Sequence, residues 1–120
     1  IIGCGVTTSR AVDAAQILDK EGISCRVVNM STIKPIDTDL ILDCAKKTKG
    51  IITVEDHNII GGLGSAVSEV LSQCNPIFMS FVGTKDVFGE SGEPDELAEK
   101  YGIDSNAIIS SAKQLLKKIQ

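Results

Sequence analysis

The side chains of this sequence best suited to chemistry cluster around its only histidine. His57 lies between Asp56 and Asn58, directly after a short apolar stretch. A histidine in that position could carry a proton or orient a neighbouring group. The sequence offers it no evident nucleophile, and no second histidine from which to build a metal site. The competing interpretation is structural, with His57 hydrogen-bonded in a loop or lying at a subunit interface.

Three glycines follow the histidine at a predicted helix start, namely Gly61, Gly62 and Gly64. Backbone N–H groups at such a start can approach a bound anion closely. Glu55 and Asp56 oppose a phosphate there, because two nearby carboxylates repel it unless a metal ion intervenes. The glycines could instead let the helix pack closely on the preceding strand, and both interpretations stay open at this point.

A second glycine-containing loop follows the first apolar stretch, with Gly3 and Gly5 two residues apart. It begins like a dinucleotide-binding fingerprint, but Thr8 stands where the third glycine would be. The loop therefore predicts either a tight strand-to-helix turn that needs a flexible backbone or a phosphate or nucleotide site.

A third polar, glycine-rich segment runs from residue 83 to residue 92. Phe88 within it could anchor the domain on another domain or subunit, or it could plug the end of this domain's own core. Ser91 has the chemistry of a nucleophile but no base beside it in sequence, so a helix-capping role suits it better.

Short apolar stretches alternate with amphipathic ones and would position these loops. We expect strands at 1–2, 25–30, 51–54 and 77–82. We expect helices to begin near Thr7, Asp37, Gly61, Pro94 and Asp104. Short, apolar strands between helices are typical of a parallel sheet covered on both faces. The sequence thus predicts one α/β domain over residues 1–120, with a mostly parallel sheet in a three-layer α/β/α arrangement.

The composition narrows the classes of function. A chain of 120 residues with 42% hydrophobic and 23% charged residues is typical of one soluble globular domain. The net charge of -4 argues against binding to nucleic acid or an anionic membrane. No apolar run approaches the ~20 residues of a membrane span. The four cysteines are widely spread, which favours reduced thiols in a cytoplasmic protein over a zinc site or a disulfide scaffold.

Longer blocks of the sequence resemble the C-terminal domain of the transketolase family. The segment from Val54 to Val67 reads VEDHNIIGGLGSAV, and the block from Phe88 to Gly92 reads FGESG. ELAEKYGI at 96–103, the opening GCGVTTSRAVDAA and the segment NMSTIKPID at 29–37 match as well. The resemblance covers nearly the whole chain in order. Deoxyxylulose phosphate synthases and the β subunits of 2-oxo acid dehydrogenases share this domain, but the FGESG block favours transketolase.

The resemblance implies a structural, dimer-supporting domain of an enzyme that transfers a two-carbon ketol unit between sugar phosphates, as in the pentose phosphate pathway. Thiamine diphosphate and Mg²⁺ would bind in preceding domains or a companion subunit, so we expect this fragment to hold no cofactor and no catalytic residue. The alternatives are a regulatory nucleotide- or anion-binding module and the corresponding domain of the related enzymes, including a docking domain of a multienzyme complex.

The family pattern also implies the strand order 2-1-3-4, with one antiparallel edge strand placed before Ile1 and missing from this chain. In that order the Gly3–Gly5 loop and the Glu55–Gly64 loop border one crevice at the switch point of the sheet, where α/β proteins commonly bind ligands. Because the sequence lacks an initiator methionine and begins on a predicted strand, we expect it to be a fragment of a longer polypeptide.

Overall fold

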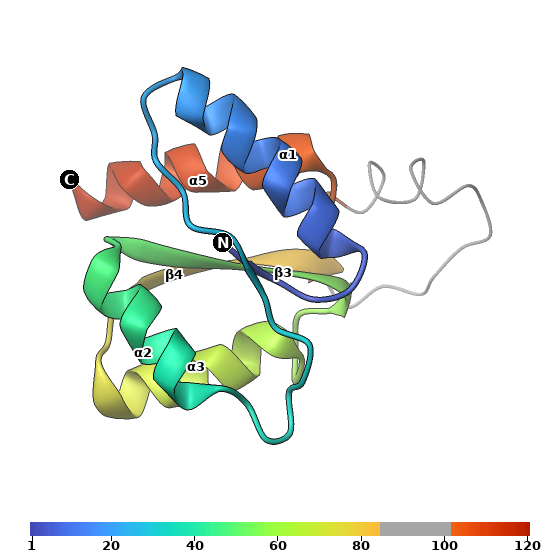
Figure 1. The fold of residues 1–120 in the computed structure, drawn as a ribbon, viewed down its shortest axis with the longest axis vertical. Coiled ribbons are helices and arrows are strands. Elements are labelled where there is room, and N and C mark those ends of the chain that lie inside the picture. Colours follow the sequence, from blue (N-terminus) through green and yellow to red (C-terminus); the bar gives the residue numbers. More distant parts are fainter. Residues whose placement is uncertain (85–101) are drawn as a thin grey trace.

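A four-stranded sheet with helices on both faces forms the framework of the domain (Figure 1). The computed structural model describes residues 1–84 and 102–120. Within these ranges the elements are β1 (Ile2–Gly3), α1 (Thr7–Lys20), β2 (Val28–Asn29), α2 (Thr38–Lys47), β3 (Gly50–Asn58), α3 (Leu63–Cys74), β4 (Phe78–Thr84) and α5 (Ser105–Ile119). The predicted alternation of strands and helices is confirmed over these residues.

All neighbouring strands run parallel, in the order β2-β1-β3-β4. In the register of the sheet, Ile2 lies opposite Val28 on one side and opposite Thr53 on the other. The predicted α/β class and the strand order 2-1-3-4 are therefore confirmed. β2 is shorter than the predicted 25–30, because it pairs only with the two-residue strand β1.

β3 is longer than the sequence indicates. The sequence predicts an end at Val54, but the strand continues to Asn58, which still pairs with Thr84 of β4. The register shifts between Val54 and Asn58, so the extension is irregular. Glu55 and His57, which the sequence places in a loop, thus belong to the last part of a strand.

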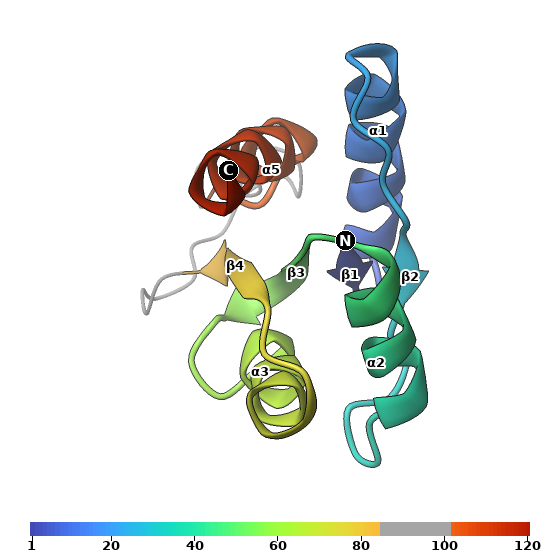
Figure 2. The ribbon, with the colours of Figure 1, turned by 90° about the vertical axis from the view of Figure 1, so that its left-hand side faces the viewer.

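The helices form one layer on each face of the sheet, with α1 and α5 on one side and α2 and α3 on the other (Figure 2). β3 supplies both layers, because alternate side chains of a strand point to opposite faces. Ile52 and Val54 pack with α1 and α5, whereas Ile51 packs with α2 and α3. The three-layer α/β/α arrangement is confirmed.

The helix starts show which caps the sequence predicts correctly. Asp37 accepts a hydrogen bond from the N–H of Leu40 at the start of α2, and Asp104 does the same for Ala107 at the start of α5. The expectation that a threonine or Ser9 caps α1 is wrong. Val6 occupies the cap position and makes no side-chain cap.

Three expectations fall where the structure gives no test. The helix near Pro94, and the roles of Phe88 and Ser91, lie outside the described residues. The antiparallel edge strand would precede Ile1. Among the described helices, none is long and apolar enough to cross a membrane.

Candidate functional site

The two glycine loops meet at the carboxyl ends of β1 and β3. Gly3, the last residue of β1, lies opposite Val54 of β3 in the parallel register. The segment that starts α1 and the segment that starts α3 therefore leave the sheet side by side. This is the switch-point geometry that the strand order implies.

Thr7 ties the first loop to the end of β3. Its side chain is fully buried, and its Oγ1 accepts the N–H of Cys4 at 3.1 Å. The Thr7 hydroxyl hydrogen can reach the carbonyl oxygen of Cys4 at 2.8 Å or that of Val54 at 2.9 Å. One hydroxyl thus closes the turn after β1 and fixes α1 against the neighbouring strand.

Local packing explains the glycine at position 3, and backbone conformation explains the glycine at position 5. A Cβ on Gly3 would lie 3.2 Å from Thr7 Oγ1 and 3.2 Å from Thr8 Cα, closer than a side chain is normally accommodated. Gly5 has a φ of 60°, in the left-handed region that favours glycine. The tight-turn interpretation therefore accounts for both positions without a ligand.

Glu55 caps the start of α3 from the neighbouring strand. Its side chain is fully buried. Its Oε1 accepts the N–H of Leu63 at 2.8 Å, and its Oε2 accepts the N–H of Gly64 at 2.9 Å. These are the first two N–H groups of the helix, which have no partner within the helix itself.

The Glu55 carboxylate takes the place that a bound anion would take at this helix start. The N-terminus of a helix attracts negative charge through its free N–H groups and its dipole. At α3 the protein supplies that negative group itself. An incoming phosphate would have to displace a buried side chain from both N–H groups of Leu63 and Gly64.

Gly64 also lets α3 approach the sheet closely. A Cβ there would lie 2.7 Å from Cδ1 of Phe81 and 2.8 Å from Oγ1 of Thr53. Gly61 has a φ of 77°, and Gly62 is the cap residue of α3. The close-packing interpretation thus explains Gly64 directly, and chain conformation explains Gly61.

The Cys4 thiol lies close enough to Glu55 and Asp56 for their charges to act on it. Partial burial raises its pKa above the ordinary thiol value, and the charges of Glu55 and Asp56 raise it further. The reactive form of a cysteine is the thiolate, so this environment makes Cys4 a poor nucleophile. The site offers no evident covalent chemistry through this sulfur.

Sequence reasoning missed the second buried threonine at this edge. Thr53 is fully buried beneath α3, and within the described structure its hydroxyl has no hydrogen-bond partner. Its only signal in the sequence is a threonine inside an apolar stretch. The sequence predicts Thr7 only as a helix cap, although its position directly after the Gly3–Gly5 turn suits a bond back to the turn.

For His57, the structure describes only the position of the backbone. His57 lies within β3, and its roles as proton carrier, ligand or interface residue stay predictions. In the described residues there is no group of three or more histidine, cysteine or acidic side chains that could hold a metal ion.

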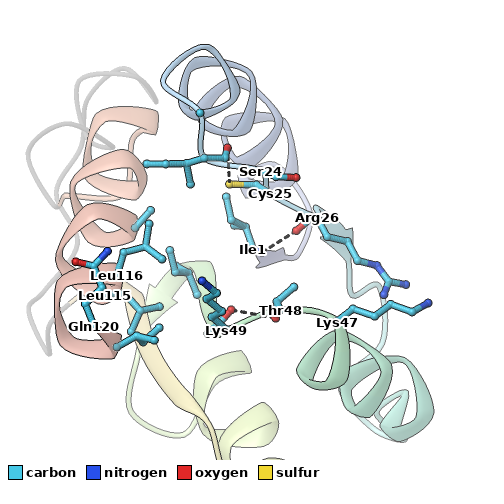
Figure 3. Close-up of a pocket in the computed structure, with 16 residues that line it drawn as sticks. Ile1, Ser24, Cys25, Arg26, Lys47, Thr48, Lys49, Leu115, Leu116 and Gln120 are labelled. Atoms are coloured by element: carbon cyan, nitrogen blue, oxygen red, sulfur yellow. Dashed lines mark hydrogen bonds between the residues drawn. The ribbon is translucent and has the colours of Figure 1, made fainter.

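A separate cavity of about 590 Å³ lies at the opposite, amino-terminal edge of the sheet. Its lining includes Ile1, Lys49 and Leu115 (Figure 3). Arg26 and Lys47, at its rim, both contact the carboxylate of Asp43, at 2.7 Å and 3.1 Å. Gly3, Gly5, Glu55 and the glycines at the start of α3 do not line this cavity.

Comparisons with known proteins agree with the fold described above. A family model described as "Transketolase, C-terminal domain" matches residues 1–108. The transketolase of Rattus norvegicus is 46% identical over 119 residues, which cover 98% of this chain and 19% of that protein. A putative transketolase C-terminal section from Methanocaldococcus jannaschii is 45% identical over 121 residues, covering 98% of this chain and 37% of that protein.

A solved structure gives the same result in three dimensions. It is titled "Split gene transketolase, inactive beta4 tetramer" and superimposes with a TM-score of 0.94 at 44% sequence identity. The match covers 99% of this chain and 39% of that one. The present chain therefore spans less than two-fifths of the length of each of these relatives.

Proposed function

The chain belongs to the transketolase C-terminal domain family, and from that premise we propose that it is the structural, dimer-supporting part of a larger ketol-transferring enzyme. The whole enzyme would move a two-carbon ketol unit between sugar phosphates in the cytoplasm, as a step of the pentose phosphate pathway. The chain would hold the subunits together while other domains carry out the reaction.

One observation carries this proposal: the side chains at the switch point connect elements of the fold. Glu55 joins β3 to α3, and Thr7 joins α1 to the backbone of β3 at Val54. In an α/β sheet this edge is the usual ligand site. Here its best-placed polar groups already bond to the protein's own backbone.

Thiamine diphosphate and Mg²⁺ do not fit the start of α3. A pyrophosphate would need free N–H groups or cations, but the N–H groups at the start of α3 bond to Glu55. Mg²⁺ would need several oxygen ligands, and no cluster of three or more acidic, histidine or cysteine side chains is present in the described part. We therefore assign both to preceding domains or to a companion subunit.

The names of two relatives support a separate companion polypeptide. The archaeal relative is called a C-terminal section, and the solved structure is described as a split-gene transketolase. That structure is also described as an inactive tetramer. Self-association without activity in that protein is consistent with a supporting role for the domain they share.

Reconstitution of ketol transfer tests the proposal. The chain alone, supplied with thiamine diphosphate, Mg²⁺ and sugar phosphates, should show no turnover. Mixing it with a separately produced polypeptide that carries the thiamine diphosphate-binding domains should raise ketol transfer above the level of either part. Turnover by the chain alone, or no gain on mixing two folded parts, would contradict the proposal.

A further inference from the structure

The outer edge of β4 has the features of an interface. Within the described residues β4 pairs only with β3, and it forms the end of the sheet opposite β2 (Figure 2). Its sequence from Phe78 to Thr84, FMSFVGT, contains no charged residue. Natural edge strands are normally short, charged or covered, because a long neutral edge pairs with other strands. β2, with two residues, meets that expectation, whereas β4 does not.

Two aromatic side chains of β4 are exposed on opposite faces of the sheet. Phe78 is 54% exposed and Phe81 is 39% exposed. Phe81 lies beside Gly64 of α3, whereas the Ser80 hydroxyl is 2.6 Å from that of Ser111 on α5. Because strand side chains alternate, Phe78 lies on the α5 face of the sheet together with Ser80. The edge therefore carries apolar surface on both sides.

The backbone of β4 has hydrogen-bonding groups directed away from the sheet. The carbonyl oxygen of Thr84 accepts the N–H of Ile59, so it points toward β3. Backbone groups of successive strand residues point in opposite in-plane directions. The N–H and C=O groups of Met79 and Phe81 are therefore on the outer edge, whereas Gly83 farther along the strand is buried.

We propose that this edge pairs with β4 of a second copy of the chain, antiparallel, about a two-fold axis that passes through Ser80. In this register Met79 lies opposite Phe81 of the second copy and forms the hydrogen-bonded pair. Phe78 then lies opposite Val82 on the other face. Every cross-strand pair is apolar, apart from the serine on the axis. The proposal rests on the dimer-supporting role above and names the surface that performs it.

A second copy is the occupant that the chemistry of the edge favours. A two-fold contact places like residues near each other, so charges at the axis would repel. Ser80, which would lie on the axis, is neutral, and its hydroxyl contacts the neutral Ser111 of α5 at 2.6 Å. Within the described strand Phe78–Thr84, no charged residue opposes self-pairing.

The size of the surface also suits a dimer. A standard interface takes about a tenth of a small protein's surface on each partner. The chain exposes 7058 Å² in total, so the expected contact is about 700 Å². With the axis at Ser80, the segments Phe78–Val82 of the two copies overlap over about 17 Å, and the faces of α3 and α5 beside the strands would supply the rest of that area.

Sedimentation of charge-carrying variants across a concentration series tests this pairing. Met79→Glu and Phe81→Lys should each weaken self-association by about tenfold or more, because each buries an unpaired charge. An equimolar mixture of the two should recover association, since the introduced carboxylate faces the introduced ammonium across the axis. Ile17→Lys is the matched control, because Ile17 is 44% exposed on α1 and should leave association unchanged.

The proposal is overturned if the unmodified chain stays monomeric up to about 1 mM, if Phe81→Lys behaves like Ile17→Lys, or if the folded variants do not associate on mixing. Binding of β4 to a different protein without self-association counts against it as well. If the chain restores ketol transfer in an assembly that Met79→Glu and Phe81→Lys leave intact, the pairing is overturned and the proposed function stands.

A cross-linking variant keeps the test informative if Met79→Glu unfolds. Facing residues that do not share hydrogen bonds have Cα atoms about 4.5 Å apart, within the range that a disulfide can bridge. In a Cys74→Ser background, Ser80→Cys should form a disulfide-linked dimer on mild oxidation. Thr84→Cys should not, because the two copies of that residue would lie far from the axis. Equal cross-linking at both positions would exclude the proposed register.

Discussion

Glu55 Oε2 accepts the N–H of Gly64 at 2.9 Å, and this contact joins the end of β3 to the start of α3. Together with the bond from Leu63 it gives the helix an internal negative group. The same residues could have formed an anion site if the carboxylate had been absent. The contact therefore favours structural support over anion binding at the start of α3.

Glu55→Gln should lower the stability of the domain. The amide keeps one oxygen acceptor but places an NH₂ group against the second backbone N–H, which leaves that buried donor without an acceptor. We expect a loss of about 2–3 kcal/mol in the free energy of unfolding, measured by urea denaturation. Glu69→Gln, an exposed change on the same helix, is the control and should have little effect. Equal stability of both variants would show that the cap contributes nothing.

The two buried threonines should respond in opposite ways to replacement by valine. Thr7→Val removes an acceptor for Cys4 N–H and a donor to Val54, and we expect it to lower the unfolding free energy by about 1–3 kcal/mol. Thr53→Val removes a buried hydroxyl that has no partner in the described structure. It should leave stability unchanged or raise it. Thermal unfolding of the two variants gives the comparison, and a reversed order would contradict these assignments.

Gly64→Ala should destabilise the domain by overpacking. The new Cβ would meet the Phe81 ring and the Thr53 hydroxyl within 2.8 Å, and such overpacking typically costs about 1–3 kcal/mol. This exceeds the helix-propensity gain of alanine over glycine, which is about 1 kcal/mol at most. Gly50→Ala should cost less, because its new contacts are the mobile ends of Leu115 and Ile119.

A double-mutant cycle identifies the cause of that loss. Phe81→Leu should recover part of the stability lost in Gly64→Ala, because the smaller side chain can move away. Additive effects of the two changes, measured by chemical denaturation, would mean that the Gly64–Phe81 contact is not the reason for the glycine.

Cys4 should react slowly with alkylating reagents. Its pKa is raised by burial and by the charges of Glu55 and Asp56, so less thiolate is present at a given pH. In labelling followed by mass spectrometry, the rate should rise only at higher pH than for an ordinary thiol. Asp56→Asn removes one of the charges and should shift that rise to lower pH. Labelling of Cys4 at the rate of an ordinary thiol would contradict this description.

The sequence predicts the helices and the strand order well because these depend on local or family-wide patterns. Leu18, Ile41 and Ile108 are buried as their helical spacing indicates. The order of strands came from the family resemblance. Asp37 and Asp104 act as caps because their partners lie three residues away.

The site was harder to predict because its contacts join residues that the fold brings together. Glu55 bonds to residues eight and nine positions later, across a turn whose shape the sequence does not specify. Its negative charge is evident from the sequence, but its position on the helix N–H groups follows only from the structure. The close approach of Gly64 to Phe81 depends in the same way on the packing of α3 over β4.

Calorimetric titration of the folded chain tests most directly whether the switch point is structural. The titrants are ATP, inorganic phosphate and thiamine diphosphate with Mg²⁺. Because Glu55 holds the N–H groups of α3 and Thr7 closes the first loop, we predict no saturable heat with any of them. Saturable binding that is weakened by a change at Gly5 or Gly61 would contradict the account and make this edge a ligand site.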